Sequence, residues 1–441
     1  MTPASFHALA DHATSRVRGG EILTAYYSGE TSDFCRFNGA RLGQAGSVEQ
    51  ARLRVELIDA GRSANATISL SGGPDEDRAR IDAAIEALRA RIPALPEDPH
   101  LLYATEPRSS EARAQDELPD AAETAFRIAT AAGGLDLVGI YAAGTIRRGF
   151  ASSFGQRNWH EKPSFNLDFS CYLREDKAVK KSYAGARFED AAFEQVLDQA
   201  RAELEALERP PHTIAPGRYR VYLAPQALKE IIGLLAWDAF GVRAVRRRQT
   251  PLLRLADGEA RLAECVSLGE HAAGGLAPSF NAAGFPRPDS VALIDHGAWR
   301  GTLVSPRSAR EYDLLPNGAN EHESAESLEL AGGTLAIADA PAALGDGLLV
   351  NNLWYLNYSD RDACRMTGMT RFACFVVEQG AIAAPLNVMR FDDSVLDMLG
   401  PRLEALTTET EWMPSADSYG ERSTESMRLP GALIGEVALT L

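Results

Sequence analysis

Alternation of apolar and polar side chains is the feature that most constrains the fold of this chain, and its clearest example covers residues 165–173. The apolar members of that stretch are Phe165, Leu167, Phe169, Cys171 and Leu173. Because successive side chains of a β-strand point to opposite faces, a period of two predicts a strand with one buried face. The same pattern recurs at residues 53–57 and 219–223, and the nearly all-apolar run 372–377 predicts a strand buried on both faces.

Other segments have apolar residues at helical spacing. Pro74 and the three acidic residues after it predict the first turn of a helix, because negative charge suits the positive end of the helix dipole. A second apolar stripe covers residues 193–204. The clearest helix is expected from Pro225 to Phe240, with Gly241 as its natural end. A shorter helix is expected at residues 392–399.

The pattern changes along the chain. Helical periodicity dominates residues 74–207, whereas Gly, Pro, Asn and short strands dominate after about residue 242. The segment 208–212, with two adjacent prolines, is the best linker candidate. We therefore expect an α+β protein with an α/β N-terminal domain at residues 1–212 and a β-rich C-terminal domain at residues 213–441. The proline-rich, charged stretch 93–119 is expected to be a surface loop.

Charge and cysteine content limit the function classes. The formal net charge is -16, and both nucleic acids and anionic membranes would repel such an acidic surface. No run approaches the length of a membrane-spanning helix, and residues 1–20 have no apolar signal core. The five cysteines are an odd number without a C-x-x-C pair, which is typical of reduced thiols. We expect a cytoplasmic protein with no nucleic-acid or membrane partner.

Common catalytic motifs are missing from the sequence. It has no P-loop, no G-x-S-x-G nucleophile elbow and no dinucleotide-binding G-x-G-x-x-G. None of the eight histidines belongs to an H-E-x-x-H zinc motif. Two His-Glu pairs occur, at His160 and His322, but each lacks a second histidine one turn later. Both are interpreted as polar loop residues, not as metal ligands.

Three further features of the sequence each allow two interpretations. The arginines at positions 243 and 246–248 fit a solvated turn, or contact with an acidic partner surface or a peptide carboxylate. Trp354, Tyr355 and Tyr358 fit packing in a core or an interface, or a platform for substrate. Cys364 has no recognisable histidine partner, so an inert thiol is favoured over a nucleophile.

The order of segments in the C-terminal half resembles the TldD/TldE (PmbA) peptidase family. An apolar strand at residues 347–356 leads to Thr367-Gly368, then to a second strand at 371–378, and then to the stretch 380–385, which ends in Pro385. The downstream segment 392–399 and the apolar tail that ends at Leu441 also fit this succession. Earlier stretches at residues 37–44, 144–154 and 165–173 resemble the family more loosely.

The resemblance implies a departure from the zinc-bearing TldD type. In that type, a helix near the start of the C-terminal domain carries His-Glu and a second His, and a late cysteine completes the zinc site. The matching helix here is 225–240, which has no histidine, and Lys229 takes roughly the place of the first ligand. The last cysteine is Cys374, in the predicted buried strand. An ammonium group and aliphatic side chains cannot replace imidazole and thiolate on zinc.

This departure is similar to the TldE branch, whose members pair with a zinc-bearing TldD-like subunit. The resemblance therefore implies a non-catalytic subunit with no catalytic or metal-binding residues and no cofactor of its own, zinc being expected in the partner. Together the subunits would degrade or trim unfolded peptides. Trp354, Tyr355 and Arg371 are the candidates for the partner interface or the wall of the peptide chamber. The alternatives are a stand-alone homo-oligomeric peptide-binding or scaffold protein, and a hydrolase with an unrecognised site.

Overall fold

The first of two β-sheets is formed by the N-terminal half of the chain. The structure, a computed structural model, describes residues 1–114 and 118–441. The seven-stranded sheet has the order β3-β2-β1-β5-β6-β4, and β7 pairs with the same edge of β6 as β4, farther along the strand. Its strands are β1 (Ile22–Asn38), β2 (Arg41–Asp59), β3 (Arg62–Ser69), β4 (Ser110–Arg113), β5 (Asp136–Ser152), β6 (Arg157–Arg174) and β7 (Lys177–Gly185). All neighbours are antiparallel except β4, which runs parallel to β6.

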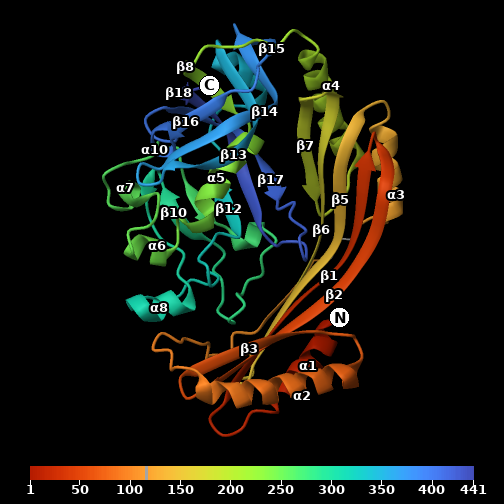
Figure 1. The fold of residues 1–441 in the computed structure, drawn as a ribbon, viewed down its shortest axis with the longest axis vertical. Helices are drawn as coiled ribbons and strands as arrows, with labels where there is room; N and C mark the ends of the chain where they lie inside the picture. Colours follow the sequence, from red (N-terminus) through yellow and green to blue (C-terminus); the bar gives the residue numbers. More distant parts are fainter. Residues whose placement is uncertain (115–117) are drawn as a thin grey trace.

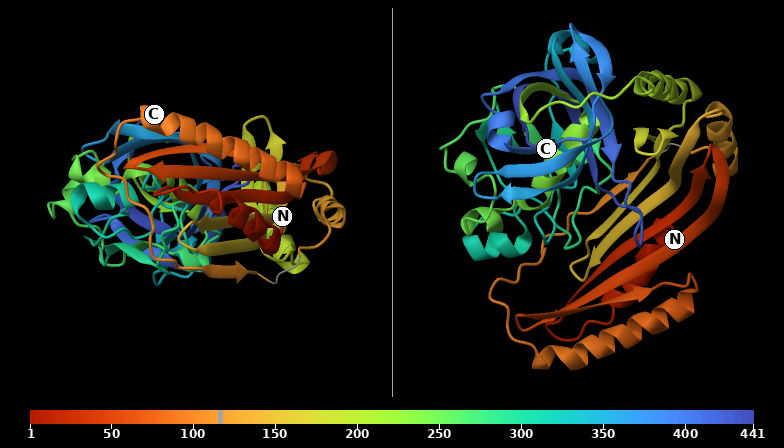
Figure 2. Two further views of the ribbon diagram at one scale, coloured as in Figure 1. Left: turned by 90° about the horizontal axis from the view of Figure 1, so that it is seen from below. Right: turned by 45° about the horizontal axis from the view of Figure 1, so that its top comes forward.

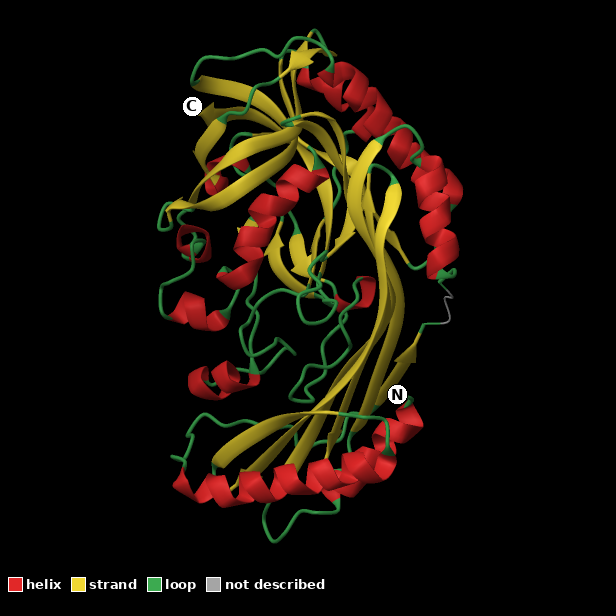
Figure 3. Ribbon diagram, turned by 45° about the vertical axis from the view of Figure 1, so that its right-hand side comes forward, coloured by secondary structure: helices red, strands yellow, loops and turns green. Residues whose placement is uncertain are grey.

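Four helices pack on this sheet: α1 (Pro3–Thr14), α2 (Pro74–Arg91), α3 (Ala121–Ala131) and α4 (Asp190–Leu207). The long strands curve between α1 and α2 at one end and α3 and α4 at the other (Figures 1 and 3). The alternation predicted for residues 165–173 is confirmed, because Phe165, Leu167 and Cys171 of β6 are fully buried and face α3 and α4. The predicted loop 93–119 includes residues 115–117, outside the described residues, and its described part contains a 3₁₀ turn, η1 (Ile92–Ala94), and β4.

The second sheet, of eleven strands, has the order β11-β10-β9-β12-β18-β16-β14-β13-β8, with β15 on β14 and β17 on β18. Its strands are β8 (Gly217–Leu223), β9 (Leu268–Glu270), β10 (Val291–Asp295), β11 (Ala298–Trp299), β12 (Ser327–Leu330), β13 (Gly347–Asp360), β14 (Arg365–Glu378), β15 (Ala381–Pro385), β16 (Arg390–Ser394), β17 (Leu403–Pro414) and β18 (Ser426–Leu439). The division at residues 212 and 213 stays a prediction.

Helix α5 (Pro225–Asp238) packs on β13 and β18 of the second sheet. Its buried residues recur at helical spacing, from Leu228 through Ile231 and Ile232 to Leu235, as the sequence predicted. Shorter helical turns occupy the connections: α6 (Val242–Arg246), α7 (Leu253–Ala256), η2 (Ala272–Gly274), α8 (Pro306–Tyr312), η3 (Ile337–Asp339), α9 (Ala340–Leu344) and α10 (Val395–Met398).

The predicted helix 392–399 is wrong at its start. Asp392 and Asp393 lie in β16 and pair with β14, and the helix that follows, α10, has only four residues. The two acids resemble a helix N-terminus in sequence, but Asp393 is buried and accepts hydrogen bonds from Arg402 and from the backbone N–H of Ala438. Tertiary contacts therefore decide the conformation of this segment.

The two sheets share one apolar cluster. Ala373 and Phe375 of β14 are fully buried against residues of β6, α3 and α4. The two units thus lie side by side along β7, which contacts both β14 and β17 (Figure 2). Within the described part of the chain, no helix combines the length and apolar character needed to cross a membrane.

Candidate functional site

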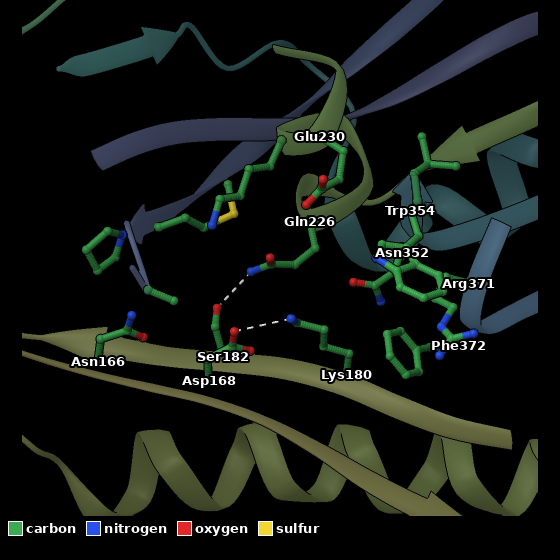
Figure 4. Close-up of a pocket in the computed structure, with 15 residues that line it drawn as sticks. Asn166, Asp168, Lys180, Ser182, Gln226, Glu230, Asn352, Trp354, Arg371 and Phe372 are labelled. Atoms are coloured by element: carbon green, nitrogen blue, oxygen red, sulfur yellow. Dashed lines mark hydrogen bonds and ion pairs between the residues drawn. The ribbon is translucent and has the colours of Figure 1, made fainter. Parts of the chain in front are cut away.

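A polar cavity of about 240 Å³ lies where α5 faces β6 and β7 on one side and β13 and β14 on the other (Figure 4). Titratable side chains from both sheets converge on it, which is typical of binding sites.

A larger cavity, of about 860 Å³, lies between α1, β2 and the start of α2. Its buried carboxylate, Asp77, accepts hydrogen bonds from the backbone N–H groups of Ser71 and Gly72 and therefore serves that turn.

Polar contacts join the two sheets across the floor of the cavity. Gln226 of α5 donates a hydrogen bond of 2.7 Å to the hydroxyl of Ser182 on β7. That hydroxyl donates in turn to Glu411 of β17 at 3.1 Å. On the same floor, Lys180 of β7 forms an ion pair of 3.2 Å with Asp168 of β6. The cavity is thus built at a crossing of the N-terminal sheet with elements of the C-terminal half.

Two adjacent residues of α5, Lys229 and Glu230, also line the cavity. Burial lowers the pKa of Lys229, and nearby carboxylates, first among them Asp168, offset part of this effect. Burial raises the pKa of Glu230, and Lys229 counteracts this shift. Among the described residues, no carboxylate lies within ion-pairing distance of the Lys229 ammonium. The cavity therefore holds a cation whose charge is only partly compensated.

The opposite wall is an aromatic and cationic group on β13 and β14. The guanidinium carbon of Arg371 lies 4.3 Å from the ring centroid of Trp354 and 4.8 Å from that of Phe372. Phe372 has a left-handed backbone conformation, with φ of 59°, and so does Tyr355, with φ of 55°. Such conformations are unfavourable for bulky residues, and strain of this kind clusters at functional sites.

Two further cavities adjoin the first. One, of about 470 Å³, shares Lys229, Met413 and Ala416 with it and continues along α5 past Trp237. The other, of about 270 Å³, shares Asp168, Lys180 and Ala416 with it and continues over the N-terminal sheet. The segment 413–418 borders all three. Together they offer room for an elongated ligand, not only for a compact one.

The donor set of the cavity does not fit a zinc ion. Helix α5 contributes an ammonium and a carboxylate, Lys229 and Glu230, and neither imidazole nor thiolate lines this cavity. Cys374 is 2% exposed and lies under the wall, with its Sγ 3.3 Å from the carbonyl oxygen of Arg371. Burial raises the pKa of its thiol, which disfavours the thiolate that zinc requires. In the described part of the chain, no group of three or more His, Cys, Asp or Glu residues is arranged to hold a metal.

The structure brings together two of the three residues that the sequence singled out. Trp354 and Arg371 both line the cavity. Tyr355 does not line it; its ring packs against Trp354, with 4.2 Å between centroids, and the residue is 71% exposed. Tyr355 therefore faces outward, where it is available to another surface.

The interpretation of His160 as a loop residue is wrong. His160 lies in β6, is 8% exposed, and hydrogen-bonds through Nε2 to the carbonyl oxygen of Leu276 at 3.1 Å. Lys162 and Pro163 continue the same strand. Burial lowers the pKa of His160 to about 4, so its imidazole is neutral at pH 7. His322 is exposed in a turn, as predicted.

The structure also explains the arginine cluster and Cys364. Arg247 forms an ion pair with Glu311 at 3.6 Å and Arg248 with Asp257 at 2.9 Å, which supports the solvated-turn interpretation of the arginine cluster. Cys364 is fully buried, and burial raises the pKa of its thiol to about 12. This supports an inert thiol.

Several lining residues were missed by sequence reasoning: Asp168, Lys180, Ser182, Gln226 and Asn352. A signal was present for Asp168, because the period of two places it on the face opposite Phe165 and Leu167. No local pattern, however, indicates that this second face of β6 meets α5 across a cavity, because the two elements are far apart in the chain.

Comparison with known proteins identifies the family. The family model described as the PmbA/TldA metallopeptidase C-terminal domain matches residues 216–440, more than half of the chain. A search of curated proteins gave no significant match. Among solved structures, TldE from Thermococcus kodakarensis is similar with a TM-score of 0.77 at 15% identity, covering 99% of this chain and 100% of that chain.

Two further solved structures have the same fold. One, from Thermotoga maritima and named as a candidate modulator of a DNA gyrase, has a TM-score of 0.79 at 13% identity, covering 99% of this chain and 100% of that one. The other, from Bacteroides thetaiotaomicron and named for the same role, has a TM-score of 0.71 at 15% identity, covering 99% and 98%. With the model match over its C-terminal half, the chain belongs to the PmbA/TldA (TldD/TldE) metallopeptidase family.

Proposed function

We propose that this chain is a zinc-free, non-catalytic TldE-like subunit of a TldD/TldE-type metallopeptidase that degrades or trims unfolded peptides. In this role it binds peptide and closes the chamber of a zinc-bearing, TldD-like partner. The observation that carries the proposal is the donor set of α5, where Lys229 and Glu230 enter the cavity without an imidazole beside them. Without zinc, the chain has no polarised carbonyl and no activated water to offer a peptide bond.

The free edge of β2 supports a role in an assembly. Residues 41–49 of this strand are all exposed, although they pair with β1 along one side. Strand β3 pairs only with residues 52–59, so in the described chain no strand covers the outer edge of residues 41–50. Long uncovered edges favour pairing with another chain, and this one has neither Pro nor Lys to prevent it.

The linked cavities support peptide binding. They offer an elongated space lined with hydrogen-bonding groups, which suits recognition of a peptide through its main chain. We further propose a cytoplasmic location, in keeping with five cysteines kept reduced, and no nucleic-acid partner, in keeping with the net charge of -16.

Reconstitution tests the proposal. The full chain is assayed on an unstructured peptide alone, with a TldD-like partner, and with a partner whose first zinc-binding histidine is changed to Ala. We expect activity only with the intact partner, and far less than one zinc per molecule of this chain after mild chelation. Activity of this chain alone, stoichiometric zinc in it, or activity that survives the change in the partner would each contradict the proposal.

The same experiment separates the proposal from the alternative of a stand-alone scaffold. If the chain binds no TldD-like protein and instead forms a stable homodimer, a homo-oligomeric peptide-binding or scaffold protein becomes the better explanation. The uncovered β2 edge serves either assembly, so only the identity of the partner distinguishes the two.

A further inference from the structure

The guanidinium of Arg371 is a cation with no anionic partner. It stacks between the rings of Trp354 and Phe372, and no carboxylate of the described residues lies within ion-pairing distance of it. Arg361, in the turn between β13 and β14, provides a contrast, because it stacks on Tyr358 at 5.0 Å but forms an ion pair of 2.6 Å with Asp238. Stacking fixes the plane of Arg371 and leaves the donors at its edge available.

An amide group lies directly beside this cation. Asn352 of β13 is the register partner of Arg371 on β14, so their side chains are close neighbours across the two strands. The side chain of Asn352 lines the cavity and is directed into it (Figure 4). Asn352 is only 6% exposed, yet no described residue hydrogen-bonds with its amide. Because this amide is open to the cavity, a ligand or water there can satisfy it.

Guanidinium and amide groups in one place favour a carboxylate ligand. Arg binds a carboxylate through two parallel N–H···O bonds, and the Asn amide can donate to the same group or to the adjacent main-chain carbonyl. The rings of Trp354 and Phe372 hold the guanidinium at the cavity wall, where it can meet such a ligand. The remaining cations of the cavity are less suitable, because Lys180 is already paired with Asp168 and burial of Lys229 disfavours its charged form and lowers its pKa.

Away from Arg371, two unpaired carboxylates line the cavities, with Lys229 between the two spaces. Glu230 lines the first cavity and Glu425 lines the neighbouring one, and neither carboxylate forms an ion pair with a described residue. Burial raises the pKa of each, and Lys229 offsets part of this shift at Glu230. Each of these carboxylates can accept hydrogen bonds from a ligand ammonium group or from main-chain N–H groups.

We propose that these cavities bind the carboxy-terminal end of a peptide in one orientation, with its terminal carboxylate at Arg371 and Asn352 and its amino-terminal side directed toward Glu230 and Glu425. The inference rests on the proposed peptide-binding role and specifies the end of the peptide that is recognised. A strand-like peptide rises about 3.3 Å per residue, so the linked cavities suit a segment of a few residues.

Calorimetric titration of the full chain with the tetrapeptide Ala-Leu-Ala-Leu tests the inference. The peptide is used with both ends free, with an amidated carboxy-terminus, and with an acetylated amino-terminus. We expect amidation to weaken binding about tenfold or more, because a charge-assisted hydrogen bond contributes about 1.5–3 kcal/mol. Acetylation is expected to weaken it by a smaller factor, since the acidic end of the site is more open to water.

Two variants and a control locate the effect. Arg371→Gln is expected to weaken binding of the free peptide to the level of the amidated one and to abolish the difference between the two. Asn352→Asp places a negative charge beside Arg371 and is expected to do the same. Arg361→Gln, at the paired arginine outside the cavity, is expected to leave both affinities unchanged. Thermal melting of each variant shows whether it is folded before its affinity is interpreted.

The binding measurements can support or overturn the carboxylate site. The inference is overturned if the folded chain binds free and amidated peptides equally, binds neither at millimolar concentration, or retains its preference in Arg371→Gln. These outcomes concern binding by this chain alone. Reconstituted activity with a zinc-bearing partner is a separate measurement, so failure of the proposed subunit role is recognised independently of the carboxylate site.

Discussion

Arg422 inserts into the N-terminal sheet and donates hydrogen bonds of 2.9 Å from Nη2 to both the carbonyl oxygen and the hydroxyl of Ser164. Its Nη1 donates to the carbonyl oxygen of Gly144 at 3.1 Å. The residue is 6% exposed and lies in the connection between β17 and β18. This connection begins beside the cavities, at residues 415–418, so Arg422 fixes one border of the candidate site to the other sheet.

Replacing Arg422 by Met should therefore loosen this connection and destabilise the fold. The change leaves buried carbonyl oxygens without donors, which costs about 1–3 kcal/mol. Urea unfolding measures the loss, and hydrogen exchange should show faster exchange in residues 415–425 than in the wild type. Arg428→Met, at a weaker surface pair with Glu329 at 3.9 Å, is the control and should change stability by less than about 0.5 kcal/mol. Equal effects of the two changes would contradict the anchoring role.

The core face of α5 gives a second prediction. Leu235 is 3% exposed and packs against the second sheet, so Leu235→Ala should destabilise the chain by about 2–5 kcal/mol through lost burial and the cavity left behind. Trp237 lies on the same helix but is 73% exposed, and Trp237→Ala should cost under about 1 kcal/mol. Chemical denaturation of both variants checks the ratio. A loss below about 0.5 kcal/mol for Leu235→Ala would mean that the packing of α5 is misassigned.

The behaviour of Leu235 was predictable from sequence, and that of Asp392 was not. Periodicity reports which face of an element is apolar, so it located α5, β6 and β8 correctly. It does not report what a polar side chain meets across the fold. Asp392 and Asp393 have the sequence character of a helix start, yet pairing with β14 holds them in a strand. The candidate site depends on such contacts as well, since Asn352 and Arg371 become neighbours only when β13 pairs with β14.

Because His160 is buried, the free energy of unfolding of the chain should depend on pH. Its pKa is about 4 in the folded chain, lowered chiefly by burial, against an ordinary value of 6.5. Below pH 6.5 the unfolded chain binds a proton that the folded chain does not, so stability falls as the pH drops toward 4. The difference amounts to roughly 3 kcal/mol, at about 1.4 kcal/mol per pKa unit. Above pH 6.5 this contribution is fully present.

His160→Gln removes this titration and keeps an amide that can donate to Leu276. Its free energy of unfolding should therefore fall less than that of the wild type between pH 7 and pH 4, although other groups that titrate affect both proteins alike. Urea titrations at both pH values measure the difference, and His322→Gln, at an exposed turn, is the matched control. A parallel fall in the wild type and His160→Gln would show that this imidazole is not protected from protonation.

The exposed edge of β2 is the expected site of association with another chain. Val48 is 38% exposed and Leu42 is 49% exposed, on a strand segment whose outer edge is uncovered by the described chain. If another chain adds a strand there, lysine at either position places a charge in the new pairing, as natural edge strands do to prevent association. We expect association to weaken about tenfold, which corresponds to about 1.4 kcal/mol. Tyr419→Lys, at a fully exposed position in the connection between β17 and β18, provides the matched control and should leave association unchanged. Sedimentation velocity over a range of concentrations, with this chain alone and with a TldD-like partner, measures the effect on both assemblies. Unchanged association in Val48→Lys and Leu42→Lys would remove this edge from the interface.

Because Trp354 and Tyr355 are also exposed and apolar, the same measurement on Tyr355→Ser would then show whether the aromatic surface beside the cavity is the contact instead.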